Sequence, residues 1–215
     1  MQKNNYSLML SEGVVRAIDM EAARLGTNRS ALINRILAEY VSYVTPEMRA
    51  REILSSVISA LGGNFRTEGE SDTGVSLTSS LAYRYRPTVR YSLELYRSGA
   101  ALGEIRVSMR TKNPALLRSF EEFCMRFASI EHRYLGDTEY VVGEGRFSRV
   151  LRLRKNDGIS DMMTLTSLGN LVAEYIAMLD RALQAFCAYA TDLYTAVSAV
   201  EEIYRAYLAR TEVFL

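Results

Sequence analysis

Hydrophobic and polar residues alternate at the start of the chain, within the segment 5–44. The alternation covers residues 5–10 and places Tyr6, Leu8 and Leu10 on one side of the backbone. A period of two residues is typical of a β-strand with one apolar face. An isolated strand of this length is unstable, so the pattern predicts that it pairs with another strand.

Two short amphipathic helices are predicted directly after this strand. Ser11 stands at the position of a helix N-cap, and the apolar residues that follow it recur every three or four positions. Gly26 supplies the left-handed residue that ends such a helix, and Asn28 can cap the next one, which runs to about Val41. The apolar positions of the two helices are Val14, Ile18, Ala22, Leu25, Leu32, Ile33, Ile36, Leu37, Tyr40 and Val41.

A unit of this size cannot bury a core of its own, so the pattern predicts a homodimer. If the strands of two copies pair, they form a two-stranded ribbon of the size that enters a DNA major groove. Double-stranded DNA is therefore the partner that this segment indicates.

The same segment resembles the ribbon-helix-helix superfamily, which includes MetJ, Arc and the CopG-type repressors. The resemblance covers about residues 3–44 and depends on two motifs. The first is Leu10-Ser11-Glu12 at the start of the first helix, and the second is Gly-Thr-Asn-Arg-Ser-Ala-Leu-Ile at residues 26–33. The fold that it implies is a dimer in which two ribbons pair antiparallel and alternate side chains read base edges.

The resemblance also implies which residues contact DNA. The base-reading positions on the strand are Asn5, Ser7 and Met9. The phosphate contacts are Asn28, Arg29 and Ser30 at the start of the second helix, with Lys3 as the only cation close to the strand. Met9 can make only apolar contacts, for example with a thymine methyl group. The alternative is a ribbon that dimerises without binding DNA.

A helix and a linker are predicted for residues 45–80, between this head (1–44) and a larger body (81–215). Thr45 and Pro46 are suited to the start of a helix that continues to Leu61. Residues 64–80 are rich in Gly, Ser, Thr and acidic residues, which predicts a surface loop or linker.

The body is predicted to be an α+β domain with an antiparallel sheet. Apolar residues alternate on both sides of a turn in 88–111 and again in 139–155, which predicts two β-hairpins. The segment between them, residues 113–132, has the apolar spacing of a helix. Two hairpins separated by a helix favour a sheet with one apolar and one polar face.

Several arginines fall on the predicted polar face of that sheet. They are Arg90, Arg106, Arg110, Arg152 and Arg154. The simpler interpretation is an outer face in contact with water, as antiparallel sheets commonly have. The alternative is a site for an anion, a nucleic acid or an acidic partner.

A long C-terminal helix is the second strong pattern. From Val172 to Tyr207 apolar residues recur at alternating spacings of four and three, as in a heptad repeat. An unbroken helix over 171–209 would be about 58 Å long, so it either bends near Ala190-Thr191 or projects into a partner subunit. We expect residues 159–215 to be an assembly or protein-partner surface. The alternative is a helix that lies wholly within the core.

Composition narrows the function classes. The chain has 215 residues and a formal net charge of +1, although residues 159–215 hold seven acidic and three basic residues. His132 is the single histidine and has no cluster of metal-ligating residues beside it. No nucleophile or phosphate-loop motif is present, so we expect neither an enzyme nor a bound metal or cofactor. No apolar run is long enough to cross a membrane, and Cys124 and Cys187 fit the core of a reduced, cytoplasmic protein.

A sequence-specific DNA-binding protein is the function that these patterns favour, most simply a dimeric transcriptional repressor. A second reading is a DNA-bound adaptor of plasmid or phage maintenance, acting in partition, replication control or relaxosome assembly. An antitoxin is a third reading, but such proteins usually have short disordered tails, whereas this body carries a core pattern.

Overall fold

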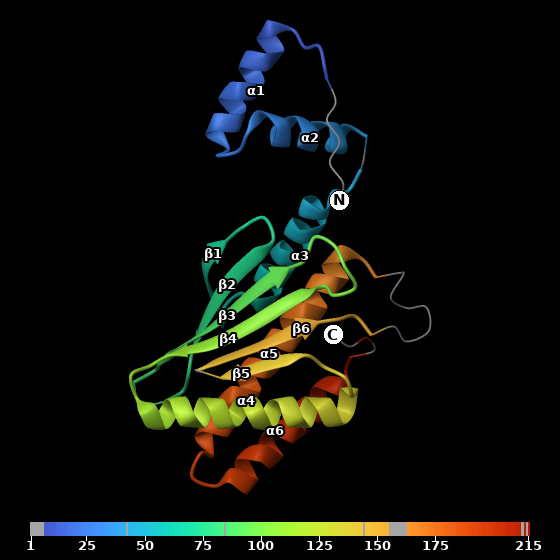
Figure 1. Ribbon diagram of the computed structural model, residues 1–215. Helices are drawn as coiled ribbons and strands as arrows, with labels where there is room; N and C mark the ends of the chain where they lie inside the picture. Colours follow the sequence, from blue (N-terminus) through green and yellow to red (C-terminus); the bar gives the residue numbers. More distant parts are fainter. Residues whose placement is uncertain are drawn as a thin grey trace. The chain divides into compact units, whose positions relative to one another are not determined.

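The computed structural model describes residues 7–41, 43–83, 85–143, 145–154, 163–211, 213 and 215. The chain divides into two compact units, Met1–Arg49 and Ala50–Leu215. We refer to them as unit 1 and unit 2. Figure 1 shows the elements of each unit with their labels.

Unit 1 contains the two predicted helices, α1 (Glu12–Arg24) and α2 (Arg29–Tyr40). Gly26 has φ +61°, the left-handed conformation that the predicted end of α1 requires. The Asn28 side chain accepts a hydrogen bond from the Ala31 N–H at 2.9 Å and so caps α2 as predicted. Ser11 stands at the N-cap of α1, but its side chain makes no capping hydrogen bond.

The predicted strand at residues 5–10 is not formed in the described part of the chain. Residues 7–10 have no regular secondary structure, and Asn5 and Tyr6 lie outside the described residues. A strand of this length needs a second strand beside it. The expected partner is a second copy of the chain, so the strand has no partner within one copy.

Residues 45–80 differ from the linker that their composition predicted. Helix α3 (Pro46–Leu61) is where it was expected, but strands β1 (Arg66–Glu70) and β2 (Gly74–Ser80) follow it. The loop prediction for 64–80 is therefore wrong. In β2, Val75 and Leu77 are buried, while Ser76 and Thr78 alternate with them and pair across strands, so the small polar residues serve one face of a sheet.

The sheet of unit 2 is antiparallel and has the strand order β1-β2-β3-β4-β6-β5. The first predicted hairpin is β3 (Thr88–Leu95) with β4 (Gly103–Arg110), and the second is β5 (Tyr140–Gly143) with β6 (Arg146–Leu151). Both hairpins are confirmed. The two strands that the sequence missed extend the sheet beyond β3, so the α+β class holds with six strands instead of four.

One face of the sheet is covered by helices and forms the core. Helix α4 (Pro114–Leu135) connects the two hairpins as predicted, and α5 (Leu165–Ala188) runs behind the sheet in Figure 1. The inward residues of the strands join the helices in a single hydrophobic cluster, with Val89, Ile105 and Phe127 fully buried. The opposite face carries polar side chains and is the outer face used below.

The C-terminal segment with the heptad pattern forms two helices instead of one. Helix α5 ends at Ala188, and α6 (Leu193–Leu208) begins after Asp192, whose carboxylate caps it by accepting from the Tyr194 and Thr195 N–H groups. Of the two alternatives for this segment, the structure has the break near Ala190-Thr191 and not the unbroken helix to residue 209. Most of the apolar heptad positions between Val172 and Tyr207 are buried inside unit 2. The surface that was expected to serve assembly is therefore part of the hydrophobic core.

Helices α3 and α5 approach each other closely at Gly169. A Cβ atom added to this glycine would lie 2.4 Å from Ser56 Cβ and 2.7 Å from the Ile53 carbonyl oxygen. Only a residue without a side chain fits there. This contact fixes α3 against the core of unit 2.

Candidate nucleic-acid interface

The predicted phosphate-binding residues lie at the start of α2. Asn28 and Ser30 are exposed, and Asn28 uses its side chain on the Ala31 N–H. The first backbone N–H groups of a helix have no acceptor within the helix and carry a partial positive charge. The N–H groups of Arg29 and Ser30 occupy that position here, so the α2 terminus has the geometry that binds phosphate.

Arg29 is engaged by a neighbouring carboxylate. Its Nε donates to Asp19 Oδ1 at 2.7 Å and its Nη2 donates to Asp19 Oδ2 at 2.5 Å, which links α2 to α1. The Arg29 hydrogen bonds lower the pKa of the Asp19 carboxyl group from its usual value. Both side chains are about half exposed, so the pair contributes little stability and a phosphate can compete for the arginine.

The predicted base-reading residues are only partly within the described chain. Ser7 and Met9 are exposed, and the Met9 side chain is fully accessible to solvent. Asn5 and Lys3 lie outside the described residues. Ser7 and Met9 are thus free to contact a ligand.

The apolar faces of α1 and α2 are largely exposed. In the described part of residues 7–44 twelve large apolar side chains are exposed, whereas Ala22, Leu32 and Ala38 are the buried apolar residues. The exposed set is Leu8, Met9, Leu10, Val14, Met20, Leu25, Ile36, Leu37, Tyr40, Val41, Tyr43 and Val44. Exposed apolar patches of this kind mark contact surfaces.

Three of the five arginines predicted for the polar face lie on the outer face of the sheet. Arg90 in β3 and Arg106 and Arg110 in β4 alternate with buried residues and lie on the outer face of the sheet. Arg90 pairs with Glu68, and Arg106 donates to Glu104 at 2.6 Å, which lowers the pKa of the Glu104 carboxyl group. Arg110 has no ion-pair partner among the described residues.

The other two members serve the end of the second hairpin. Arg152 follows β6 and donates to Glu139 at 2.6 Å. Arg154 donates to the backbone oxygens of Leu135 and Asp137, at and just beyond the C-terminus of α4. Arg154 therefore satisfies helix-end carbonyl groups, as a cation at this position does, and is not part of the outer face.

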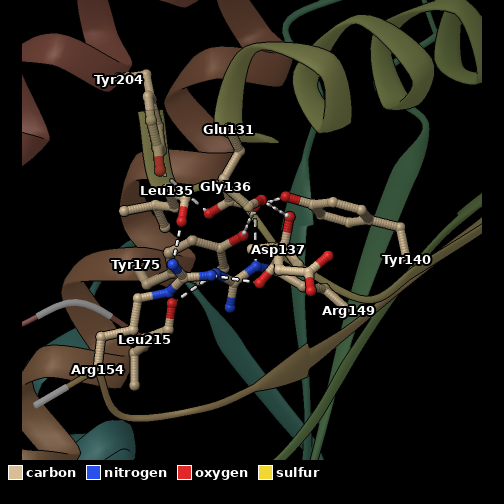
Figure 2. Close-up of polar contacts among 11 residues, drawn as sticks. Glu131, Leu135, Gly136, Asp137, Tyr140, Arg149, Arg154, Tyr175, Tyr204 and Leu215 are labelled. Carbon is tan, nitrogen blue, oxygen red and sulfur yellow. Dashed lines mark hydrogen bonds and ion pairs between the residues drawn. The ribbon is translucent and has the colours of Figure 1, made fainter. Parts of the chain in front are cut away.

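A buried ionic cluster lies beneath the sheet, and the sequence analysis missed it. Glu131 on α4 and Arg149 on β6 are 0% and 1% exposed, and Arg149 Nε donates to Glu131 Oε2 at 2.8 Å. The hydroxyl groups of three tyrosines donate to the same carboxylate, as Figure 2 shows. They are Tyr140 at 2.7 Å, Tyr175 at 3.2 Å and Tyr204 at 3.3 Å.

Arg149 is held on several sides. Its Nη2 donates to the Leu215 backbone oxygen at 2.6 Å, and its guanidinium carbon lies 4.8 Å from the centre of the Tyr175 ring. Burial raises the pKa of the Tyr140, Tyr175 and Tyr204 hydroxyl groups, so all three stay protonated and donate. Because the donors converge on one carboxylate inside the core, the cluster fits a structural role.

The signal for this cluster was present in the alternation of β6. Phe147 and Leu151 alternate onto the buried face of β6, and Arg149 lies between them with the same parity. A charged residue in phase with a buried face requires a buried partner. Glu131 lies on the apolar side of α4 and is that partner.

The residues that could bind a metal or act as thiol nucleophiles are dispersed or buried in the described part of the chain. No group of three or more His, Cys, Asp or Glu side chains there could hold a metal ion. His132 lies in the last turn of α4, as expected. Cys124 and Cys187 are free and buried, and burial raises the pKa of both thiols, that of Cys187 to about 11. Such thiols are poor nucleophiles at neutral pH.

The helices that the structure describes include none with the length and hydrophobicity needed to cross a membrane. Comparison with known proteins adds no relative: no protein-family model matches the chain, and no curated protein or solved structure is significantly similar to it.

Proposed function

We propose that the protein is a dimeric regulator of transcription that binds duplex DNA through unit 1. The observation that carries this proposal is the exposed apolar surface of α1 and α2, next to an α2 N-terminus suited to phosphate. The ribbon-helix-helix resemblance accounts for both features at once. It assigns the apolar surface to a second copy and the helix terminus to the DNA backbone.

The dimer follows from the burial balance within unit 1. Leu8 and Leu37 are 61% and 50% exposed, in a unit whose helices bury only small or isolated apolar residues. Covering a leucine side chain contributes about 1.5–3 kcal/mol. A second copy offers the same apolar set and a partner strand for residues 5–10, so one contact satisfies both needs.

The DNA contact follows from the α2 terminus. The N–H groups of Arg29 and Ser30 point away from the helix, and the Arg29 side chain is held at the same end by Asp19. A DNA phosphate would accept from these N–H groups and replace the Asp19 carboxylate as the partner of Arg29. Ser7 and Met9 would then face base edges from the paired strand.

The experiment measures binding of the full chain to duplexes selected from a random library. Arg29→Ala should weaken binding to every sequence and make the salt dependence shallower by about one phosphate contact. Ser7→Ala should instead change which sequences are preferred. Arg16→Ala is the matched control, because Arg16 is an exposed α1 arginine paired with Glu12.

Equal losses for Arg29→Ala and Arg16→Ala would remove the phosphate role of α2. A wild-type protein that binds no duplex at about 50 mM salt would refute the proposed function as a whole. The antitoxin reading is disfavoured, because unit 2 has a continuous core and is not a short tail.

A further inference from the structure

The register of the sheet brings the outer-face arginines into one line. Arg66 in β1 is opposite Thr78 in β2, which is opposite Arg90 in β3. Arg90 is opposite Ser108 in β4, which is opposite Arg146 in β6. Directly paired residues point to the same face of a sheet, so these five side chains form a row across five strands. We call this row the arginine row.

The spacing of the arginine row is regular. Its three arginines occupy alternate strands, with a hydroxyl side chain between each pair. Neighbouring strands are about 4.8 Å apart, so successive arginines stand about 10 Å apart and the row extends about 19 Å. That length is a little over half of one turn of B-DNA, which is about 34 Å.

Charge is separated along the strands of this face. The arginine row and Arg110 lie toward the end where β3 starts and β4 finishes. Toward the other end Glu94 is directly opposite Glu104, with Glu139 close to the end of β6. Within the described strands, arginines without an acidic partner are therefore concentrated at one end, whereas at the other end Glu104 and Glu139 are paired with Arg106 and Arg152.

Three of the cations at the positive end are uncompensated. Among the described residues Arg66, Arg110 and Arg146 have no carboxylate partner, although Arg90 pairs with Glu68. All three are exposed. Several like charges gathered at one end without acids beside them create a local positive potential, which attracts an anionic partner.

The chemistry of the face distinguishes among polyanions. Single-stranded nucleic acids are held largely by bases stacked on aromatic side chains. The outward positions of β2, β3, β4 and β6 that surround the row carry no aromatic residue. Exposed arginine side chains instead donate to phosphate oxygens. An outer face with exposed arginines and no aromatic residue around them fits the backbone of a duplex.

We propose that the arginine row, with Arg110, is a second DNA-binding surface that contacts the phosphate backbone of duplex DNA without reading its sequence. The choice of duplex DNA as ligand rests on the function proposed for unit 1, whereas the surface itself is defined by unit 2 alone. The row adds phosphate contacts that a small ribbon head lacks.

The test compares two triple variants of the full chain that remove equal charge. The row variant carries Arg66→Gln, Arg110→Gln and Arg146→Gln. The control carries Arg118→Gln, Arg126→Gln and Arg133→Gln, three exposed positions of α4 in the helical layer. Both should keep the wild-type circular dichroism and melting temperature, because the side chains are exposed.

Binding to a fluorescent duplex is then titrated between about 50 and 200 mM salt. The row variant should lose at least about ten-fold in affinity for all sequences, and its salt slope should fall by up to about 2.7, which is 0.9 for each phosphate released. The control should match the wild type. The preferred sequence should not change, since the row contacts no bases.

The outcomes separate the two proposals. If Arg29→Ala and Ser7→Ala have no effect and the row variant loses binding, the row stands and the function of unit 1 falls. If the row variant binds like the α4 control, the row proposal is overturned whatever unit 1 does. Absence of duplex binding by the wild type overturns both, and binding of poly-glutamate in its place would assign the face to an acidic protein.

Discussion

The two units differ in how they bury apolar side chains. Unit 2 encloses one continuous hydrophobic cluster between a sheet and its helices, with side chains such as Val107 and Phe120 almost completely covered. Unit 1 has the same kind of amphipathic helices but leaves residues such as Leu37 and Tyr40 exposed. An amphipathic pattern therefore shows which side chains need to be buried. Whether the same chain can bury them depends on the size of the unit.

The largest expected effect is on association through unit 1. Leu8→Asp together with Leu37→Asp should convert the proposed dimer to a monomer, because each change places a carboxylate in the proposed apolar contact. Sedimentation velocity measures the change in mass, and the melting temperature of unit 2 should stay the same.

Met125→Asp is the control for this prediction. Met125 is a similarly exposed apolar residue on α4 of unit 2, and its substitution should leave the proposed dimer intact. A wild-type chain that sediments as a monomer at micromolar concentration would contradict the view that unit 1 is completed by a second copy.

The next largest effect is on the stability of unit 2. Arg149→Ala should lower the free energy of unfolding by about 3–5 kcal/mol, because it leaves the buried Glu131 carboxylate without its cation. Denaturant titration followed by circular dichroism gives the value. Arg152→Ala removes an exposed ion pair near the end of the same strand and should cost about 1 kcal/mol or less.

Two similar losses would mean that the buried cluster contributes no more than a surface pair. In that case the three tyrosine hydroxyl groups would be sufficient to hold the Glu131 carboxylate.

The smallest effect is a pH dependence of unit 2. Cys187 has a folded pKa of about 11, raised from 9.0 by burial, so its thiol stays protonated in the folded state. The contribution of the protonated Cys187 thiol to stability is fully present below about pH 9. It is lost as the pH rises toward 11, because the thiol can then ionise in the unfolded chain. Denaturant titration from pH 8 to 11 should show a shallower fall for Cys187→Ala.

Iodoacetamide labelling provides a second measurement of the same property. At pH 8 native Cys187 should react much more slowly than in the denatured chain. Rapid labelling of the folded protein would show that the thiol is not buried in solution.

Much of unit 2 could be predicted from the period of its apolar residues. The β3–β4 hairpin and α4 have strong, continuous patterns, and the structure has them where they were expected. Strands β1 and β2 were missed because Ser, Thr and Gly are typical of loops. Their β character comes from pairing of β2 with β3 and of β1 with β2. Local composition carries no information about such long-range pairing.

The candidate site could be predicted only in part. Asn28 as a cap and the outward direction of Arg90 and Arg106 follow from local periodicity. The inclusion of Arg66 and Arg146 in one row depends on the strand order, which no local pattern contains. The Arg149–Glu131 pair was missed because Arg149 was left out of the alternation of β6, where it has the same parity as the buried Phe147 and Leu151.

The buried Arg149–Glu131 pair also limits how the last hairpin can assemble. Strand β5 is only four residues long and forms an edge of the sheet, so few backbone hydrogen bonds fix its position on β6. A shift of β6 by one residue against β4 would turn Arg149 toward solvent and leave Glu131 enclosed without a cation. The ion pair therefore raises the free energy of arrangements in which β6 is shifted by one residue, whereas an all-aliphatic core would tolerate them.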